Sequence, residues 1–264
     1  MIPSDMTWIQ LLTIHQQMQK DLVSLGREKE QLQELLRLRE EFEALVVHDL
    51  RNPLNAIIVA LNLLQGMKDQ VKTPEPFLRA TELAKNATQR MAQLISTLLD
   101  IARLEAGKLV LNISDFDLSA LIRDVIEMQK VTAAGTVAIV PHTLPGLMIK
   151  ADRDVLGRVV ANLLDNALKF SPPESTVEIT AQSLDNQAIR INVIDAGPGV
   201  PPEERERIFE KFAQVNDEQH ENRSGTGLGL TFCRMAVEAH GGCIRVDDKP
   251  SGAGSCFSIQ IPKE

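Results

Sequence analysis

The sequence predicts a multi-domain protein of α and α+β type, in which a helical hairpin forms a dimeric four-helix bundle and is followed by an α/β sandwich. Apolar residues recur at steps of three and four through most of the first 104 residues, which is the spacing of helix faces. Beyond Gly107, short apolar runs typical of strands are mixed with shorter helical patterns. With 264 residues and an apolar fraction of 44%, the chain can bury two ordinary cores.

Composition limits the possible functions. The formal net charge of −8 argues against a nucleic-acid-binding surface. No apolar run approaches the ~18 residues that cross a bilayer, and the first residues lack the layout of a secretion signal, so we expect a cytoplasmic protein. Cys233, Cys243 and Cys256 have neither disulfide nor metal-site spacing. We expect them to be small buried residues, with redox sensing as the alternative.

Residues 1–38 are expected to form a coiled-coil stalk. Leucine or methionine recurs every seven residues, at Leu11, Met18, Leu25 and Leu32. Charged residues interrupt the seams and Gly26 weakens the middle, so we expect a break near Gly26. A charged single helix is the alternative.

Residues 39–108 are expected to form the hairpin. The first helix continues from the stalk to about Gly66, residues 73–76 mark a turn, and the second helix ends at Gly107. Each helix is apolar on more than one side of its stripe. Pairing two hairpins would cover these surfaces, which predicts a homodimer.

His48 lies within the first helix, off its apolar stripe. Asp49 is its neighbour, and Asn52 lies one turn further along the same face. Pro53 removes a backbone donor and should bend the helix. An imidazole beside a carboxylate and a carboxamide has the parts of a nucleophile, a base and a water-orienting group, although a surface histidine is the simpler alternative.

Residues 112–264 are expected to form the sandwich, joined to the hairpin by a short strand at 108–111. Asp117 or Ser119 should cap one helix and Asp152 another. The helices are expected at about 117–130, 153–170, 203–210 and 228–240, and the strands at about 137–140, 148–151, 176–182, 188–195, 243–247 and 255–261.

Four stretches of the sandwich carry possible chemistry. Asn162, Asn166 and Lys169 share one helical face, where amide oxygens can ligate Mg²⁺ and an ammonium can balance phosphate. Asp195 ends an apolar strand, where a carboxylate can accept the amine of adenine while Gly197 and Gly199 let the backbone approach the ring. Either stretch alone could be an ordinary cap or turn.

The other two stretches are an aromatic pair and a glycine-rich turn. Residues 208–212 end in Phe212, just before a polar segment at 213–224 that we expect to form a mobile lid. Residues 225–230 place three glycines directly before a helix, where backbone N–H groups can bind phosphate.

Together these stretches resemble the kinase core of two-component sensor histidine kinases. The segment His-Asp-Leu-Arg-Asn-Pro-Leu at 48–54 resembles the H box of that family, and 162–170 its N box. Residues 195–199, 208–212 and 225–230 resemble the G1, F and G2 boxes. The resemblance covers roughly 40–262. It implies a signalling stalk at 1–38, a dimerisation and histidine phosphotransfer domain at 39–108, and a catalytic domain of the Bergerat ATP-binding fold at 112–264.

The resemblance implies autophosphorylation of His48 by ATP, with Asp49 taking up the ring proton. Asn166 would hold Mg²⁺ and Asp195 the adenine. The residues implied to bind nucleotide are Asn162, Asn166, Lys169, Phe170, Asp195, Gly197, Gly199, Phe212, Gly225, Thr226, Gly227, Leu228, Gly229 and Leu230.

The resemblance also implies transfer of the phosphoryl group to an aspartate of a separate response-regulator receiver domain. Asn52 occupies the position that orients water in the family, which implies phosphatase activity as well. Many relatives carry an arginine two residues after the F-box phenylalanine, whereas this chain has Gln214. Arg207 or Arg223 could supply the contact instead, and the alternative is that both are ordinary solvated side chains.

Three alternatives remain at this stage. A plain ATPase of the gyrase, chaperone and mismatch-repair type, or a serine kinase that acts on an anti-sigma antagonist, would share the nucleotide boxes but would not need His48 in a hairpin. A degenerate kinase acting as a dimeric scaffold would not need the complete set of box residues.

Overall fold

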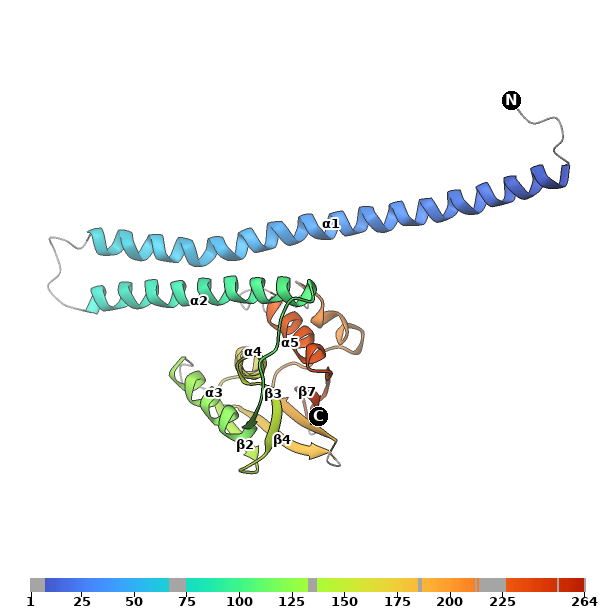
Figure 1. Ribbon diagram of the computed structural model, residues 1–264. Helices are drawn as coiled ribbons and strands as arrows, with labels where there is room; N and C mark the ends of the chain where they lie inside the picture. Colours follow the sequence, from blue (N-terminus) through green and yellow to red (C-terminus); the bar gives the residue numbers. More distant parts are fainter. Residues whose placement is uncertain are drawn as a thin grey trace. The chain divides into compact units, whose positions relative to one another are not determined.

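A computed structural model describes residues 8–66, 75–132, 137–184, 187–211, 213, 227–250 and 252–263. The chain divides into two compact units, Met1–Asn52 and Pro53–Glu264. Figure 1 shows long helices at the N-terminal end of the chain and a sheet with further helices toward the C-terminal end. This confirms the predicted class, a helical region followed by an α/β sheet domain.

The first helix, α1 (Trp8–Gly66), is 59 residues long and passes through Gly26 without interruption. The predicted break near Gly26 is therefore wrong. One glycine costs about 1 kcal/mol relative to alanine, which is too little to end a helix flanked by strong helix formers. The end at Gly66 is confirmed, and Pro53 lies inside the helix. Among the helices of the described residues, none has both the length and the hydropathy of a membrane-spanning segment.

The second helix, α2 (Glu75–Glu105), runs alongside the end of α1 in the second unit, in the opposite direction (Figure 1). It begins within the predicted turn at 73–76, whose first two residues lie outside the described part. Gly107 follows the helix in a left-handed conformation with φ of 60°, as a C-terminal glycine should. The buried apolar side chains of α2 recur every seven residues, at Ala80, Ala87, Leu94 and Ile101.

Five strands form a mixed sheet in the order β2-β4-β5-β7-β6. The pair β2 and β4 is parallel, and the other pairs are antiparallel. Alternate side chains of the inner strands are buried, which builds the core on one face of the sheet. The strands are β2 (Ala138–Thr143), β4 (Thr176–Leu184), β5 (Ala188–Ile194), β6 (Cys243–Asp248) and β7 (Ser255–Pro262).

A separate two-stranded antiparallel sheet joins β1 (Ile113–Asp117) to β3 (Met148–Asp152). The predicted connecting strand at 108–111 is wrong, because this segment pairs with no other segment of the described chain and its Val110 is 90% exposed. The strand forms a few residues later, where β3 supplies partners for the backbone.

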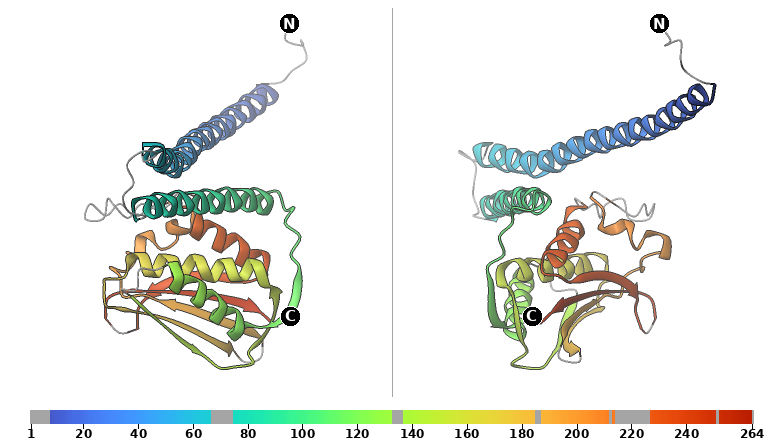
Figure 2. Two further views of the ribbon diagram at one scale, coloured as in Figure 1. Left: turned by 90° about the vertical axis from the view of Figure 1, so that its left-hand side faces the viewer. Right: turned by 45° about the vertical axis from the view of Figure 1, so that its right-hand side comes forward.

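Three helices cover the same face of the five-stranded sheet, as Figure 2 shows. Asp117 accepts the N–H of Ser119 at 2.9 Å and so caps the first of them, whereas the hydroxyl of Ser119 donates to Leu144 O at 2.5 Å. The helices are α3 (Leu118–Thr132), α4 (Arg153–Phe170) and α5 (Leu228–Ala239).

The predicted helix at 203–210 is wrong. The segment forms two short 3₁₀ turns, Pro202–Glu204 and Arg207–Phe209. Glu210 is already extended, with ψ of 156°. Backbone bonds of the i to i+3 type close both turns, and the burial of Phe209 in the core directs the chain away from a regular helix.

His240 connects two of the helices. The N–H of Asp152, before α4, donates to His240 Nε2 at 3.0 Å. Nε2 is therefore the acceptor, which assigns the proton to Nδ1, and Nδ1 donates to Ala236 O of α5 at 2.7 Å. The neutral imidazole thus links the end of α5 to the start of α4.

We expect Asp152→Ala to lower the free energy of unfolding by about 1–2 kcal/mol. Asp152 Oδ1 accepts the N–H groups of Asp154 and Val155, and Oδ2 accepts that of Asn112. Urea unfolding followed by circular dichroism measures the loss. The control Asp165→Ala, at an exposed position of the same helix, should change it by less than about 0.5 kcal/mol. Equal losses in both variants would contradict the capping role.

Candidate functional site

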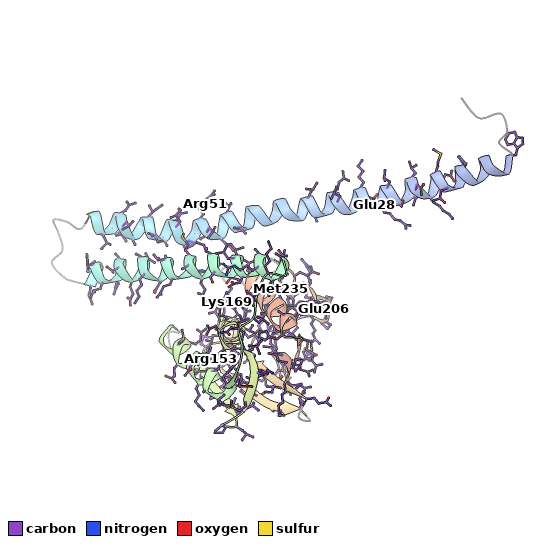
Figure 3. All side chains as sticks on the ribbon, viewed as in Figure 1. Glu28, Arg51, Arg153, Lys169, Glu206 and Met235 are labelled. Carbon is purple, nitrogen blue, oxygen red and sulfur yellow. The ribbon has the colours of Figure 1, made fainter. Side chains whose placement is uncertain are left out.

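The helix α4 carries four of the predicted site residues. The apolar face of this helix, with Leu163, Leu164 and Ala167, is buried in the core, so its polar face points away from the core. Asn162 and Asn166, one turn apart on that side, are half-buried. Lys169 and Phe170 end the helix, with Lys169 Nζ 5.1 Å from the centre of the Phe170 ring (Figure 3 labels Lys169). The two amide groups and the Lys169 ammonium group therefore all lie on the C-terminal half of α4.

Cys233 lies directly behind Asn162. The Asn162 side chain hydrogen-bonds the thiol, and Cys233 Sγ lies 3.7 Å from Val159 O. Complete burial raises the pKa of Cys233 to about 12, so the thiol stays protonated and fills space beneath the amide. The prediction of buried cysteines is confirmed for Cys233, but Cys256 is half-buried, and Cys243 is exposed.

Asp195 follows β5 and is buried, with 3% of its surface exposed. Its Oδ1 accepts the N–H of Gly197 at 2.8 Å and that of Ser255 at 3.0 Å. A Cβ atom at Gly197 would lie 3.1 Å from Phe170 O, so the glycine lets this turn approach the end of α4. The end of β5 and the end of α4 therefore lie next to each other.

The start of α5 lies against α4. Gly227 precedes the helix with φ of 65°. The first backbone N–H groups of any helix point out of its N-terminal end and away from its own carbonyl groups. A Cβ atom at Gly229 would lie 3.8 Å from Asn162 Cγ, which places the glycine turn beside the amides of α4. Gly225 and Thr226 lie outside the described residues.

The aromatic segment contributes to the core. Phe209 is 4% exposed and packs edge to face against Phe257, with 6.5 Å between ring centres. The Thr231 hydroxyl of α5 lies 3.0 Å from Glu210 O, which connects this segment to the glycine turn. Phe212 lies outside the described residues, as does the predicted lid except Ala213.

Arg207 and Arg223 are the two arginines predicted as possible phosphate contacts. Arg207 Nη1 pairs with Glu204 Oε1 at 3.0 Å and is exposed. It is therefore engaged with a neighbouring carboxylate. Arg223 lies outside the described residues.

His48, Asp49 and Asn52 lie on α1, in the unit that ends at Asn52. Asp49 is half-buried and Asn52 is exposed, whereas the side chain of His48 lies outside the described residues. The structure therefore gathers the predicted residues of α4, of the β5 end and of the α5 start, whereas the histidine segment belongs to the other unit.

Sequence reasoning missed three residues of this site. Ser171 Oγ accepts the N–H of Ala196 at 3.4 Å, and Gly254 and Ser255 lie against Asp195. The glycines before β7 were a usable signal, because a Gly-x-Gly run ahead of a strand indicates a close backbone approach.

The arrangement suits an anionic ligand with a polar ring. Amide side chains can bind a metal ion through their oxygens, and the N-terminal N–H groups of a helix can bind a phosphate. The carboxylate can accept a hydrogen bond from a ring amine. In the described part of the chain, His, Cys, Asp and Glu side chains form no group of three that could hold a metal ion. A cation here would therefore rely on amide oxygens and on the ligand itself.

Comparison with known families identifies two domains in the sequence. Residues 38–107 match the family described as His Kinase A (phospho-acceptor) domain. Residues 151–264 match the histidine kinase-, DNA gyrase B-, and HSP90-like ATPase family.

Curated relatives include adaptive-response sensory kinases named SasA. That of Crocosphaera subtropica is 31% identical over 249 residues, which are 92% of this chain and 64% of the relative. That of Thermosynechococcus vestitus is 32% identical over 250 residues, with the same two shares. The chain thus spans slightly less than two thirds of the length of the relatives it matches.

Solved structures of histidine kinases are also similar. Full-length ShkA in complex with AMPPNP is 30% identical with a TM-score of 0.59, over 84% of this chain and 45% of that one. ThkA in complex with the response regulator protein TrrA is 25% identical with a TM-score of 0.59, over 99% of this chain and 68% of that one. The catalytic fold, the histidine-bearing helix and these likenesses agree, and the chain belongs to the two-component sensor histidine kinases, of which it forms a kinase core.

Proposed function

We propose that the chain uses ATP to phosphorylate His48 and passes the phosphoryl group to an aspartate of a response regulator. The observation that carries the proposal is the meeting of the α4 amides, the Asp195 carboxylate and the start of α5, in a chain whose first helix bears a His Kinase A segment. A plain ATPase or a serine kinase would need the first feature without the second.

In this proposal the adenine amine donates to Asp195. The carboxylate is held by two backbone N–H groups at 2.8 and 3.0 Å, so its position is defined before the nucleotide arrives. Gly197 and Gly199 leave room for the ring, since neither carries a side chain. A hydrogen bond to a buried charged acceptor is worth about 1.5–3 kcal/mol, enough to select the base.

The phosphates would lie between α4 and the glycine turn. Asn166 is the proposed ligand of Mg²⁺, assisted by Asn162 or by water, with the remaining ligands taken from phosphate oxygens and water. Lys169 and the N–H groups of residues 227–230 would balance the phosphate charge, together with Gly225 and Thr226. Phe170 and Phe212 are the proposed apolar neighbours of the nucleotide.

The acceptor step needs a neutral imidazole with a free lone pair. A ring nitrogen of His48 attacks the γ-phosphorus, the bond to the β,γ-bridging oxygen breaks, and ADP leaves. The other ring nitrogen then carries a proton, and Asp49 is the proposed group that accepts it. Most of the rate enhancement comes from positioning and charge balance.

We also propose a homodimer formed by paired hairpins. Leu54, Ile58 and Leu61 of α1 and Ile95 and Leu99 of α2 are each between 45% and 53% exposed. Apolar surface repeated along two neighbouring helices is what a second hairpin would cover. The proposal extends to the stalk, where Met18, Leu25 and Leu32 are at least 60% exposed and could pair as a coiled coil.

The proposed partner is a response-regulator receiver domain on another chain. The similar kinase ThkA has been solved in complex with the response regulator TrrA, which supports this class of partner. Asn52 is exposed one turn after His48, where an amide could orient water against the acyl phosphate of the regulator. Phosphatase activity on the regulator is therefore part of the proposal. We also propose a cytoplasmic location.

Incubation with γ-labelled ATP and Mg²⁺ should give acid-labile, base-stable label on the chain. His48→Gln should abolish the label and leave ADP affinity unchanged, because the acceptor is lost but the nucleotide site is intact. Asn166→Ala should lower the labelling rate at least tenfold through loss of the metal ligand.

His15→Gln, at an exposed position of the same helix, is the matched control and should label normally. Label that survives His48→Gln would place the acceptor elsewhere. Release of phosphate without labelled protein would favour the plain ATPase. If neither free phosphate nor labelled protein forms, the result would favour the scaffold.

Asn52→Ala should keep autophosphorylation within about twofold and lower the phosphatase rate at least tenfold, because only hydrolysis needs the oriented water. The rate is measured on a receiver domain that accepts the label, isolated in its phosphorylated form and mixed with the chain and ADP. Asn55→Ala, on an exposed position three residues later, is the control. Equal loss of both activities would instead indicate damage to the helix.

Leu99→Glu should convert the dimer to a monomer in sedimentation experiments, because it places a charge in the proposed interface. Leu144→Glu is the control, since Leu144 is 79% exposed in a loop of the sandwich. It should sediment as the unaltered chain does. A monomeric unaltered chain would contradict the dimer proposal.

A further inference from the structure

The turn between β6 and β7 presses its backbone against Asp195. Gly254 has φ of 137°, and a Cβ atom on it would lie 2.2 Å from Asp195 O, so a side chain cannot be placed there without moving the backbone. Lys249 N donates to Gly254 O at 3.1 Å and closes the turn on the other side. Gly254 is therefore what allows this turn to reach the carboxylate.

Three hydrogen bonds, each donated by a backbone N–H group, join Asp195 to the neighbouring backbone. Asp195 N donates to Ser255 O at 2.9 Å, and Ser255 N donates back to Asp195 Oδ1 at 3.0 Å. Gly197 N donates to the same Oδ1 at 2.8 Å. Both lone pairs of Oδ1 are thus used, whereas no donor in the described part of the chain is recorded on Oδ2. The carboxylate cannot rotate without breaking two bonds.

We propose that Gly254 and the backbone N–H of Ser255 determine base specificity, because together they hold Asp195 so that it presents Oδ2 alone to the nucleotide. The inference rests on the proposed function, in which Asp195 lies at the base. Oδ2 of a carboxylate accepts and cannot donate. It pairs with the 6-amino group of adenine, whereas the 6-oxo group of hypoxanthine or guanine would bring a second acceptor against it.

This geometry gives an unusual expectation for Asp195→Asn. The two N–H donors require an oxygen at the Oδ1 position, so the amide oxygen of the new side chain takes that place and its NH₂ group replaces Oδ2. A donor then stands where an acceptor stood. The variant should therefore prefer the 6-oxo base, rather than bind both bases equally poorly. A side chain that rotated freely could offer either group to either base.

The test compares adenosine diphosphate with inosine diphosphate, which differ in the 6-substituent and in the proton that the 6-oxo base carries on N1. Titration calorimetry on the full chain with Mg²⁺ should give at least a tenfold preference for the adenosine nucleotide. Asp195→Asn should invert the preference. Loss of the adenosine preference without any gain for inosine would overturn the proposed clamp while keeping Asp195 at the base. If the unaltered chain binds neither nucleotide, the proposed function itself fails.

Gly254→Ala tests the turn directly. It should reduce the ratio of the two affinities to below about threefold, because the displaced turn no longer holds Oδ1. Gly252→Ala is the matched control, since Gly252 has φ of 87° in the same turn but no atom within 4 Å of the added Cβ. It should keep the full ratio. Thermal unfolding checks both variants for folding, and should Gly254→Ala not fold, Asp195→Asn decides. A folded Gly254→Ala with an unchanged ratio would refute the proposal.

Discussion

The buried carboxylate of Asp195 is the constraint on which the proposed nucleotide site depends. A carboxylate with 3% exposure is tolerated only when hydrogen bonds replace its lost hydration. Those bonds come from Gly197 on one side and from Ser255, 60 residues along the chain, on the other. The pairing of β5 with β7 holds the end of β5 beside the β6–β7 turn, and the two segments together satisfy this one group.

The same requirement extends to the helices. Gly197 approaches Phe170 O at the end of α4, and Gly229 at the start of α5 lies beside Asn162. Three segments carrying an acceptor, two amides and a set of helix N–H groups thereby share one region. The core of the sheet holds their backbones in place, so a ligand would meet groups already oriented, which lowers the entropy cost of binding.

The helix α2 has both a buried face and an exposed apolar face. In α2, residues at seven-residue spacing from Ala80 to Ile101 are buried, while Leu99 and Ile95 remain exposed. Asp100 also pairs with Arg158, whose guanidinium lies 4.4 Å from the ring centre of Phe232. One helix thus contributes to the core of the sandwich and still offers an apolar surface. The proposed pairing of hairpins would use that surface.

Several features were predictable because their signals are local. Asp152 caps α4 through N–H groups two and three residues away, and Gly107 follows α2 in the left-handed conformation that glycine favours. The limits of α4 and α5 and the alternation of the inner strands follow from similar short-range patterns. The residues of the N box share one helix face for the same reason, since spacing alone decides it.

Other features depend on contacts between distant segments. Whether 108–111 or 113–117 becomes a strand depends on where β3 lies, and the helix expected at 203–210 gives way to 3₁₀ turns because Phe209 is drawn into the core. The sequence by itself determined which groups are available for nucleotide chemistry, because composition and periodicity act over a few residues. Only the tertiary structure decided that Gly254 and Ser255 hold Asp195, because that contact exists only once strands far apart in the chain have paired.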